Sequence, residues 1–422
     1  MIGTRVGRVA VLARAIHPWH GFGGLERHVN DLVRHLLRRN VGVVLITPPP
    51  TVQGDVPADP ELADDRLEVR HVPYRTFPFA GRRGTTVLDR STAYPLFGER
   101  AGRLAADLAS AGAVDIVHGL GASALGYARR HRRGTSGSVP LVLNPQGLEE
   151  FGATDPTRAR LKRLLYRPLQ LAVVRCAGAA DRVIATDEAL RGTVERHLEI
   201  PPARIRVIPN ALDLERCDAA ATEADGRLQR DRAGIRPDEP VVLSVGRLEK
   251  NKGFTTLVEA LARLDARSDA AIPWRWVIVG DGPYRRRIVH AIDAAGLRSK
   301  VVLLGRLPDR VLHAWYEVAT LFVHPTWYEG SSLVTLEAMA HRRAVVATTA
   351  GGLPDKVRPG ESGWLVPAGD APALTQALAE ALATPAALPA MGDAGRKLVE
   401  RSFAWPSVIQ RLLDLYDELL QA

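Results

Sequence analysis

Two glutamates, Glu329 and Glu337, stand eight positions apart with turn residues between them. A serine in that turn can cap a helix running to about Ala340, which places Glu329 in the loop before the helix and Glu337 in its second turn. The free N–H groups at such a helix start favour an anion such as a diphosphate. One carboxylate on each side suits a sugar nucleotide, although a capped helix with two solvated glutamates has the same pattern. The residues expected at the helix start are Gly330, Ser331, Ser332 and Leu333.

A second candidate is the polar loop that follows the apolar run Val241–Val245. Arg247 and Lys252 flank this loop, and a helix is predicted to start at Gly253. Two cations beside a helix start can clamp a pyrophosphate and stabilise its charge as it leaves. Two exposed loop cations without a ligand are the other interpretation.

Three glycine turns and one histidine complete the candidates. Gly23 and Gly24 precede the helix expected over 25–39, where small residues allow backbone to approach a ligand, although the spelling G-x-G-x-x-G is absent. The pair Gly280 and Gly282 is interpreted as a structural turn. A third turn, at 349–355, is expected beside the ligand. His118 ends a predicted strand, where a single histidine is more often structural than catalytic.

Composition limits the classes of protein that fit. The chain has 422 residues, 46% apolar and 24% charged, which is ordinary for a globular protein of two or three domains. We find no apolar run long enough to cross a membrane and no signal peptide. The two cysteines form no metal or redox motif, which fits a reducing cytosol. We therefore expect a cytoplasmic protein.

The positive charge is confined to the first half of the chain. Residues 1–208 carry 30 Lys+Arg against 20 Asp+Glu, whereas residues 209–422 carry 26 against 27. This asymmetry suggests an anionic partner such as a phospholipid surface, a phosphorylated acceptor or nucleic acid. An arginine-rich composition that serves no partner explains it equally well.

Short β-branched runs alternate with helical periods along the whole chain, which predicts parallel sheets covered by helices on both faces. The series restarts after a polar stretch, so we predict an α/β protein of two Rossmann-like domains facing a central cleft, with ligand loops after the strands. The expected divisions are a first domain 1–208, a linker 209–238, a second domain 239–401, and a final helix 402–422 that crosses back to the first domain.

Taken together, these motifs resemble the retaining glycosyltransferases of family 4, which have the two-domain GT-B fold. The resemblance runs nearly end to end and rests on segments that occur in the expected order. These are Gly23-Gly24-Leu25-Glu26, Val207-Ile208-Pro209-Asn210, Gly246-Arg247 with Lys252-Gly253, and Glu329 with Glu337.

The resemblance implies an N-terminal acceptor-binding domain, a C-terminal nucleotide-sugar-binding domain, and a role for each matching residue. Arg247 and Lys252 would hold the donor diphosphate, and Glu337 the ribose hydroxyls. Glu329 would contact the transferred sugar. The Gly23–Gly24 turn would border phosphate and acceptor. Backbone contacts to phosphate would come from Gly330, Ser331, Ser332 and Leu333.

The same resemblance implies an α-linked UDP-, GDP- or ADP-sugar donor, no metal or other cofactor, and a sugar or lipid-linked acceptor used in cell-envelope glycan, glycolipid or exopolysaccharide assembly. Two departures concern the histidine. Many members have His-x-His where this chain has His118-Gly119-Leu120, and His-Gly where it has Gln146-Gly147. A catalytic role for His118 is therefore a weaker expectation than the others.

Three alternatives stay open at this stage. An epimerase on the same fold would change the free donor without an acceptor, and a phosphorylase would need phosphate and a lysine for pyridoxal phosphate, of which we find no signature. A non-catalytic binder of sugar nucleotides or glycans would not need the complete charged set, which is Arg247, Lys252, Glu329 and Glu337. Nucleic-acid binding lacks a recognisable module.

Two segments could reach a membrane. One is the piece Phe77–Arg83, and the other is the basic helix predicted over 158–177, whose leucines line one face. A surface helix packed on its own sheet is the alternative for the latter. Peripheral contact with the inner face of the membrane, through the basic first domain, is thus a hypothesis.

Overall fold

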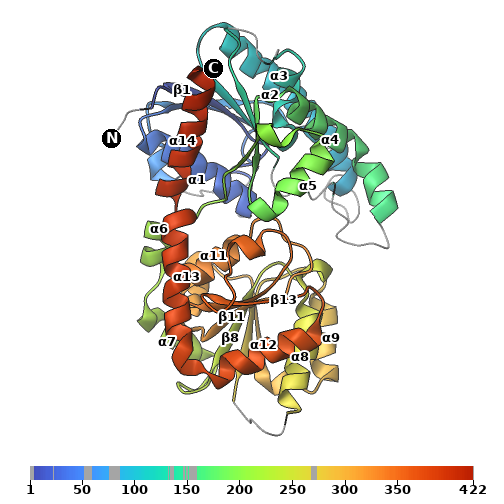
Figure 1. The fold of residues 1–422 in the computed structure, drawn as a ribbon, viewed down its shortest axis with the longest axis vertical. Helices are drawn as coiled ribbons and strands as arrows, with labels where there is room; N and C mark the ends of the chain where they lie inside the picture. Colours follow the sequence, from blue (N-terminus) through green and yellow to red (C-terminus); the bar gives the residue numbers. More distant parts are fainter. Residues whose placement is uncertain are drawn as a thin grey trace. The chain divides into compact units, whose positions relative to one another are not determined.

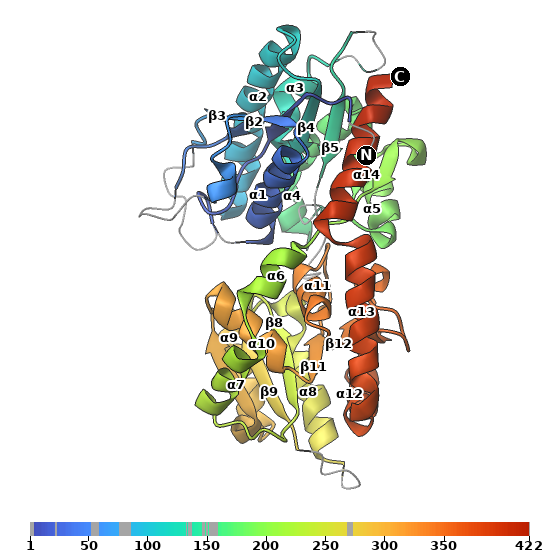
Figure 2. The same cartoon turned by 90° about the vertical axis from the view of Figure 1, so that its left-hand side faces the viewer.

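The computed structural model of the chain describes residues 4–21, 23–51, 59–75, 86–131, 133, 137–145, 148, 151, 159–267 and 273–421. It divides into two compact units. The first unit comprises Met1–Asn210 together with Trp405–Ala422, and the second comprises Ala211–Ala404. Each unit is a parallel sheet with helices on its faces (Figures 1 and 2), as the alternating sequence pattern predicts.

The first unit contains a seven-stranded sheet in the order β3-β2-β1-β4-β5-β6-β7, and every neighbouring pair is parallel. Chain order reverses between β1 and β4, which makes that position the topological switch of the sheet. The strands are β1 (Arg8–Leu12), β2 (Gly42–Thr47), β3 (Leu67–His71), β4 (Ile116–Leu120), β5 (Leu141–Asn144), β6 (Arg182–Ala185) and β7 (Ile205–Val207).

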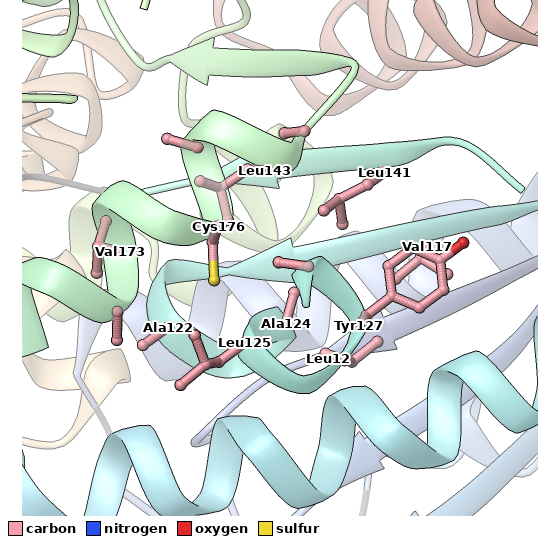
Figure 3. Close-up of a cluster of buried hydrophobic side chains, with 14 of the residues drawn as sticks. Leu12, Val117, Ala122, Ala124, Leu125, Tyr127, Leu141, Leu143, Val173 and Cys176 are labelled. Atoms are coloured by element: carbon pink, nitrogen blue, oxygen red, sulfur yellow. The ribbon is translucent and has the colours of Figure 1, made fainter. Parts of the chain in front are cut away.

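Helices cover this sheet, and one side of it forms a continuous apolar core. Figure 3 shows side chains of β4 and β5 meeting those of α3 and α4, including Leu143, Val173 and Cys176. These side chains are shielded from water because both faces of a parallel sheet are covered. The helices are α1 (Gly24–Arg38), α2 (Thr86–Ser110), α3 (Leu125–Ala128), α4 (Ala159–Ala179), α5 (Glu188–Leu198) and α14 (Trp405–Gln421).

The last helix, α14, belongs to the first unit although it follows the whole second unit in sequence. It lies beside α1 (Figure 1), and the Trp405 ring stacks on those of His28 and His35. Near its other end, Asp417 accepts a hydrogen bond from the Thr4 hydroxyl at 3.0 Å. The buried apolar face of α14 therefore completes the first unit rather than extending the second.

The second unit contains six parallel strands in the order β10-β9-β8-β11-β12-β13. Here the chain order reverses between β8 and β11. All side chains of β8 and β12 are buried, as expected for central strands covered on both faces. The strands are β8 (Val241–Val245), β9 (Arg275–Val279), β10 (Val301–Gly305), β11 (Leu321–His324), β12 (Ala344–Thr348) and β13 (Gly363–Val366).

The first two helices of the second unit, Leu214–Ala220 and Glu223–Arg232, lie in the stretch that the sequence analysis predicted to be a linker. Figures 1 and 2 show α8 and α12 side by side on one face of this sheet. The helices are α6 (Leu214–Ala220), α7 (Glu223–Arg232), α8 (Phe254–Asp265), α9 (Arg285–Ala294), α10 (Asp309–Val318), α11 (Leu333–Ala340), α12 (Ala371–Ala383) and α13 (Leu388–Ser402).

Residues 211–238 lie within the linker predicted over 209–238, but in the structure they form part of the second unit. Thr222 and Asp225 form a capping box that starts α7, and α7 packs on α10. Gly226 makes that contact close, since a Cβ there would lie 2.7 Å from the carbonyl oxygen of Ala314. Polar composition suggested a linker, but a helix with one small contact position needs few apolar residues to dock. Residues 211–238 therefore belong to the second unit.

Candidate active site

The strand-order switch of the second unit brings together the loops that carry the charged candidates. Residues 246–253 follow β8 and residues 325–332 follow β11. Because β8 and β11 are parallel neighbours, their carboxyl ends lie at the same edge of the sheet. Two segments far apart in sequence thus meet where an open parallel sheet binds its ligand.

Two glycines with positive φ hold these loops in contact. At Gly253 (φ 68°) a Cβ would lie 1.8 Å from the carbonyl oxygen of Pro325, and at Gly351 (φ 56°) it would lie 1.6 Å from that of Glu329. No side chain fits at either position. Main-chain hydrogen bonds from Trp327 to Asn251 and from Gly352 to Gly330, of 2.7 and 3.1 Å, join the same loops. The turn at 349–355 is therefore part of this site.

Lys252 and Glu329 form an ion pair at the junction of the loops. The Lys252 Nζ donates to Glu329 Oε2 at 2.7 Å, and their side chains are only 19% and 14% exposed. The same carboxylate oxygen lies 2.7 Å from Nε2 of His324, the last residue of β11. One oxygen thus receives two donors, which fixes the Glu329 carboxylate against rotation.

The surroundings keep Glu329 ionised. Burial alone raises its pKa, but the Lys252 ammonium and the His324 hydrogen bond outweigh burial and bring the pKa below the usual range of a glutamate. Burial also lowers the pKa of His324, and the bond to Glu329 only partly offsets this effect. The arrangement is therefore a carboxylate between an ammonium and a neutral imidazole, with Nε2–H as the donor.

The start of α11 lies directly beyond this pair. Ser332 is its N-cap, and its hydroxyl accepts a 3.4 Å bond from the Thr335 N–H. Ser331 Oγ is buried and has no hydrogen-bond partner among the described residues. The helix N-terminus supplies partial positive charge next to Lys252 and Glu329, which suits an anion.

Glu337 is held from behind by an aromatic residue. It lies in the second turn of α11, as expected, is 8% exposed, and its Oε2 accepts a 2.9 Å bond from the Tyr316 hydroxyl. Tyr316 is itself fully buried and stacks on His341 with an angle of 8° between the rings. The other carboxylate oxygen of Glu337, Oε1, can accept hydrogen bonds from a ligand, because a carboxylate accepts on both oxygens.

Arg247 is oriented differently from Lys252. It lies at the start of the loop after β8, where its side chain is 74% exposed and its guanidinium pairs with the Glu249 carboxylate at 2.7 Å. The two cations therefore stand on one loop without sharing a partner. A clamp formed by both requires Arg247 to leave Glu249.

The turn at 280–284 has the structural role favoured by the sequence analysis. A Cβ at Gly280 would lie 1.9 Å from the carbonyl oxygen of Gly246, and one at Gly282 would lie 2.5 Å from that of Leu248. These glycines let the loop after β9 pack against the loop after β8. They support the shape of the Arg247 loop.

The candidates of the first unit lie at its own strand-order switch. Gly23 and Gly24 are exposed after β1, and Gly23 is the N-cap of α1 with the Glu26 side chain folded over it. His118 is 1% exposed, and its Nδ1 lies 2.5 Å from the Tyr416 hydroxyl of α14. Its Nε2 is buried without a hydrogen-bond partner among the described residues. The catalytic set proposed below does not include His118. Gln146, Gly147 and the piece Phe77–Arg83 lie outside the described residues.

His324 and Tyr316 are the residues that the sequence analysis missed. His324 ends a strand just before the Glu329 loop, a position that the rule for open parallel sheets marks as a ligand edge. Tyr316 carried no such signal, because it sits inside an amphipathic helix. Only packing of α10 against α11 reveals its bond to Glu337.

In the part of the chain that the structure describes, no three His, Cys, Asp or Glu side chains gather in a way that could hold a metal ion. No helix in that part is both long and apolar enough to cross a bilayer.

Fold and site define a glycosyltransferase with two parallel-sheet domains, and comparison with known families agrees. Residues 22–216 match Glycosyltransferase Family 4, and residues 239–384 match Glycosyl transferases group 1. The chain belongs to the family 4 glycosyltransferases, with the GT-B fold.

Similar proteins cover nearly the whole chain. The α-maltose-1-phosphate synthase of Mycobacterium tuberculosis H37Rv is 30% identical over 420 residues, 97% of this chain and 98% of that protein. Sucrose-phosphate synthase from Thermosynechococcus elongatus is 24% identical with a TM-score of 0.75, over 98% and 99% of the two chains. The Anabaena HepE protein in complex with UDP-glucose is 20% identical with a TM-score of 0.69, over 97% and 99%.

Proposed function

We propose that this glycosyltransferase moves a sugar, with retention and without a metal, from an α-linked nucleotide sugar to a hydroxyl of a sugar or lipid-linked acceptor. The observation that carries the proposal is the buried Lys252–Glu329 pair beside the N-terminus of α11 at the strand-order switch. A similarly folded protein, HepE, was solved with UDP-glucose, which supports a nucleotide-sugar donor.

The reaction develops negative charge on the leaving diphosphate, and the site offers positive charge for it. Lys252, a reoriented Arg247 and the N–H groups near Ser331 and Leu333 would bind the diphosphate, with Gly330 and Ser332 completing the turn. Glu337 would accept hydrogen bonds from the ribose hydroxyls. Glu329, still bonded to Lys252 and His324, would orient the sugar hydroxyls.

The bond changes balance without a protein base. The acceptor oxygen bonds to the anomeric carbon on the face from which the diphosphate leaves, while the carbon–oxygen bond to the diphosphate breaks. The acceptor proton passes to the departing phosphate oxygen. The residues of the site thus bind and orient the reactants, and the first unit's Gly23–Gly24 turn would border phosphate and acceptor.

Metal independence follows from the same cations, because an ammonium, a guanidinium and a helix N-terminus can neutralise a diphosphate as a divalent ion does. Turnover should therefore survive excess EDTA. A loss restored only by Mg²⁺ or Mn²⁺ would show that this part of the proposal is wrong.

The location of the acceptor is suggested by one face of α4. Its other face packs in the core of the first unit, but Leu164 and Leu171 are 63% and 60% exposed, and Arg167 and Arg175 stand exposed between and beside them. We call these four residues the basic leucine face. Exposed leucines flanked by arginines suit an anionic bilayer surface.

We therefore propose a cytoplasmic enzyme in peripheral contact with anionic lipid, working on cell-envelope glycan, glycolipid or exopolysaccharide. Flotation with phosphatidylglycerol vesicles at low salt should recover the protein with the lipid, and the Leu164→Glu/Leu171→Glu variant should stay behind. The Leu228→Glu variant, at an exposed leucine of α7, is the matched control. No binding by the wild-type protein at low salt would reject membrane contact.

The test of the main proposal is a thermal-shift panel of UDP-, GDP- and ADP-sugars without metal, repeated on Arg247→Ala. A ligand that binds only the folded state raises the melting temperature. We expect one nucleotide series to stabilise the wild-type protein and to lose its effect in the variant. The acceptor is then sought by transfer from that donor.

The same panel separates the alternatives. An epimerase would convert the bound donor with no acceptor present, which chromatography of the sugar detects. A binder would show the shift but no transfer to any acceptor. No shift with any of the donors would count against the proposed donor site.

A further inference from the structure

A cavity lies in the second unit, away from the candidate active site. Its volume is about 720 Å³, within the usual range of small-molecule sites. Thr320, which precedes β11, and Arg343, which precedes β12, line it together with residues of α7 and the start of α13. The cavity therefore lies at the amino ends of the strands whose carboxyl ends carry Lys252 and Glu329. Strands of this length separate the two edges by about 15 Å.

Four arginines line this cavity, and two of them are fixed by main-chain carbonyls. Arg230 donates to the carbonyls of Pro237 and Glu239 at 3.1 and 2.8 Å, and its Nε is buried without a hydrogen-bond partner. Arg343 donates to the carbonyl of Ala319 at 3.0 Å. Among the described residues neither arginine forms an ion pair at contact distance. Carbonyls orient a guanidinium without pairing with its charge, and nearby carboxylates, Glu239 and Asp231 for Arg230 and Glu317 for Arg343, act on these charges without contact.

The other two arginines stand at the rim. Arg227 pairs with Glu223 at 2.6 Å, and Arg342 pairs with Asp393 at 3.1 Å. These side chains are 61% and 59% exposed, so their ion pairs are weak and can exchange for a ligand anion. Arginine is well suited to bind phosphate through two parallel hydrogen bonds.

Carboxylates alternate with the arginines around the cavity. Glu223, Asp231, Glu317 and Asp393 are all part of the lining. Such a lining repels a polyanion but suits a molecule with one anionic group and several hydroxyls, because hydroxyls donate to carboxylates. The chemistry that fits is that of a phosphorylated sugar or polyol.

Contacts from the cavity wall lead to the candidate active site. Glu317 accepts a 2.7 Å bond from His341 Nδ1, and the His341 ring stacks on Tyr316. Tyr316 donates to Glu337 at 2.9 Å. A ligand that draws Glu317 toward its own hydroxyls alters the support of His341, and with it the aromatic pair that holds Glu337.

We propose that this cavity is an effector site for a sugar phosphate, and that its occupancy changes nucleotide binding through Glu317, His341 and Tyr316. The coupling, but not the binding, rests on the proposed role of Glu337 in holding the ribose. Both sites lie within the second unit, so no contact between the units is needed.

Calorimetric titration of the full chain tests the binding, with D-glucose 6-phosphate, inorganic phosphate and D-glucose as probes. We expect the sugar phosphate to bind more tightly than phosphate, and glucose to give no heat. The Arg227→Gln/Arg342→Gln variant should weaken sugar-phosphate binding at least tenfold. Arg310→Gln is the matched control, because that exposed arginine pairs with Asp225 on α7 but does not line the cavity. No binding to the wild-type protein, or equal binding to the double variant, would overturn the proposal.

The Arg247→Ala variant distinguishes sugar-phosphate binding in the cavity from binding at the proposed donor site. Sugar-phosphate binding should survive in that variant, and should not compete with UDP, GDP or ADP, whichever binds the wild-type protein. Direct competition, or loss of binding in Arg247→Ala, would assign the sugar phosphate to the donor site and reject the cavity. If no nucleotide binds at all, the proposed function falls while the titration still decides whether the cavity binds.

The coupling has its own measurement. Saturating D-glucose 6-phosphate should change the Kd of the bound nucleotide about fivefold or more, and the nucleotide should change the sugar-phosphate Kd by the same factor. In Tyr316→Phe the sugar phosphate should still bind while that factor returns to one. An unchanged nucleotide Kd in the wild-type protein, or full coupling in Tyr316→Phe, would contradict the proposed connection.

Discussion

In both sheets of this molecule the strand order reverses at one position, but the side chains at the two positions differ. At β8/β11, Lys252, Glu329 and His324 form a bonded group of polar side chains. At β1/β4, exposed glycines follow one strand, while His118 on the other is buried under α14. An open parallel sheet provides a ligand edge in both units. Among the described residues, the second unit holds a bonded group of opposite charges at that edge, whereas the first holds Arg14 over the Tyr94 ring. This difference is the reason why we propose diphosphate binding for the second unit and acceptor contacts for exposed loops of the first.

Removing the Lys252 ammonium from the β8/β11 edge should reduce transferase activity more than any other change described below. Lys252→Ala deletes the only contact cation of Glu329 among the described ion pairs and leaves that carboxylate bonded to His324 alone. We expect kcat/KM to fall about 10³-fold, since one preorganised donor to developing charge contributes about 10²–10³. Steady-state transfer assays measure it. Arg263→Ala, which removes an exposed partner of Glu259 on α8, is the control.

Breaking a buried pair also destabilises the fold, by up to about 3 kcal/mol. The activity of Lys252→Ala must therefore be compared at a temperature where circular dichroism shows it folded. Activity within a few-fold of the wild type would reject the assignment of the charge to Lys252.

Glu329→Gln should have the next largest effect. The amide keeps the shape of the side chain but loses the charge that holds Lys252, and it can donate where the sugar hydroxyls need an acceptor. We expect kcat to fall about 10²-fold while the nucleotide Kd changes little. Equal losses in turnover and in nucleotide affinity would contradict the assignment of Glu329 to the transferred sugar.

His324 should act through Glu329 and have a smaller effect. His324→Phe keeps the ring volume beside Phe322 but removes the 2.7 Å bond to the carboxylate. We expect about a tenfold lower kcat with KM for the donor nearly unchanged, and partial recovery in His324→Asn. Activity of His324→Phe close to that of the wild type would show that the histidine only fills space.

The buried histidines of the first unit should make its stability sensitive to acid. Burial lowers the pKa of His28 to about 4 and that of His118 to about 3, whereas both titrate near 6.5 in the unfolded chain. Between those values the unfolded state binds more protons, so stability is full above about pH 6.5 and falls as the pH is lowered. At pH 5 each imidazole should cost about 2 kcal/mol.

Hydrogen exchange of peptides from α14 and β4, at pH 7 and pH 5 with corrected intrinsic rates, measures this loss. The His118→Leu/Tyr416→Phe variant should be less sensitive to acid than the wild type, and His290→Gln, at an exposed histidine of α9, should match the wild type. Equal protection of α14 at both pH values would show that these imidazoles do not govern its docking.

Sequence patterns located most of the secondary structure because burial and periodicity are local properties. β8 has the bounds of the apolar run Val241–Val245, and α1 and α4 lie within two residues of the helices predicted over 25–39 and 158–177. The pattern predicted less where packing decides, because the stretch expected to be a linker contains α6 and α7. In each case a partner surface stabilises turns that their own composition does not mark.

The sequence by itself determined the family, the two parallel sheets and the charged residues of the second switch, because residue type, order and strand-to-loop position are all written in one dimension. Only the tertiary structure decided which of those residues touch. It joined Lys252 to Glu329 and His324, set Arg247 apart on Glu249, and placed His118 under Tyr416. The physical reason is that a buried charge or imidazole takes its properties from neighbours brought by other strands and helices, which no local pattern records.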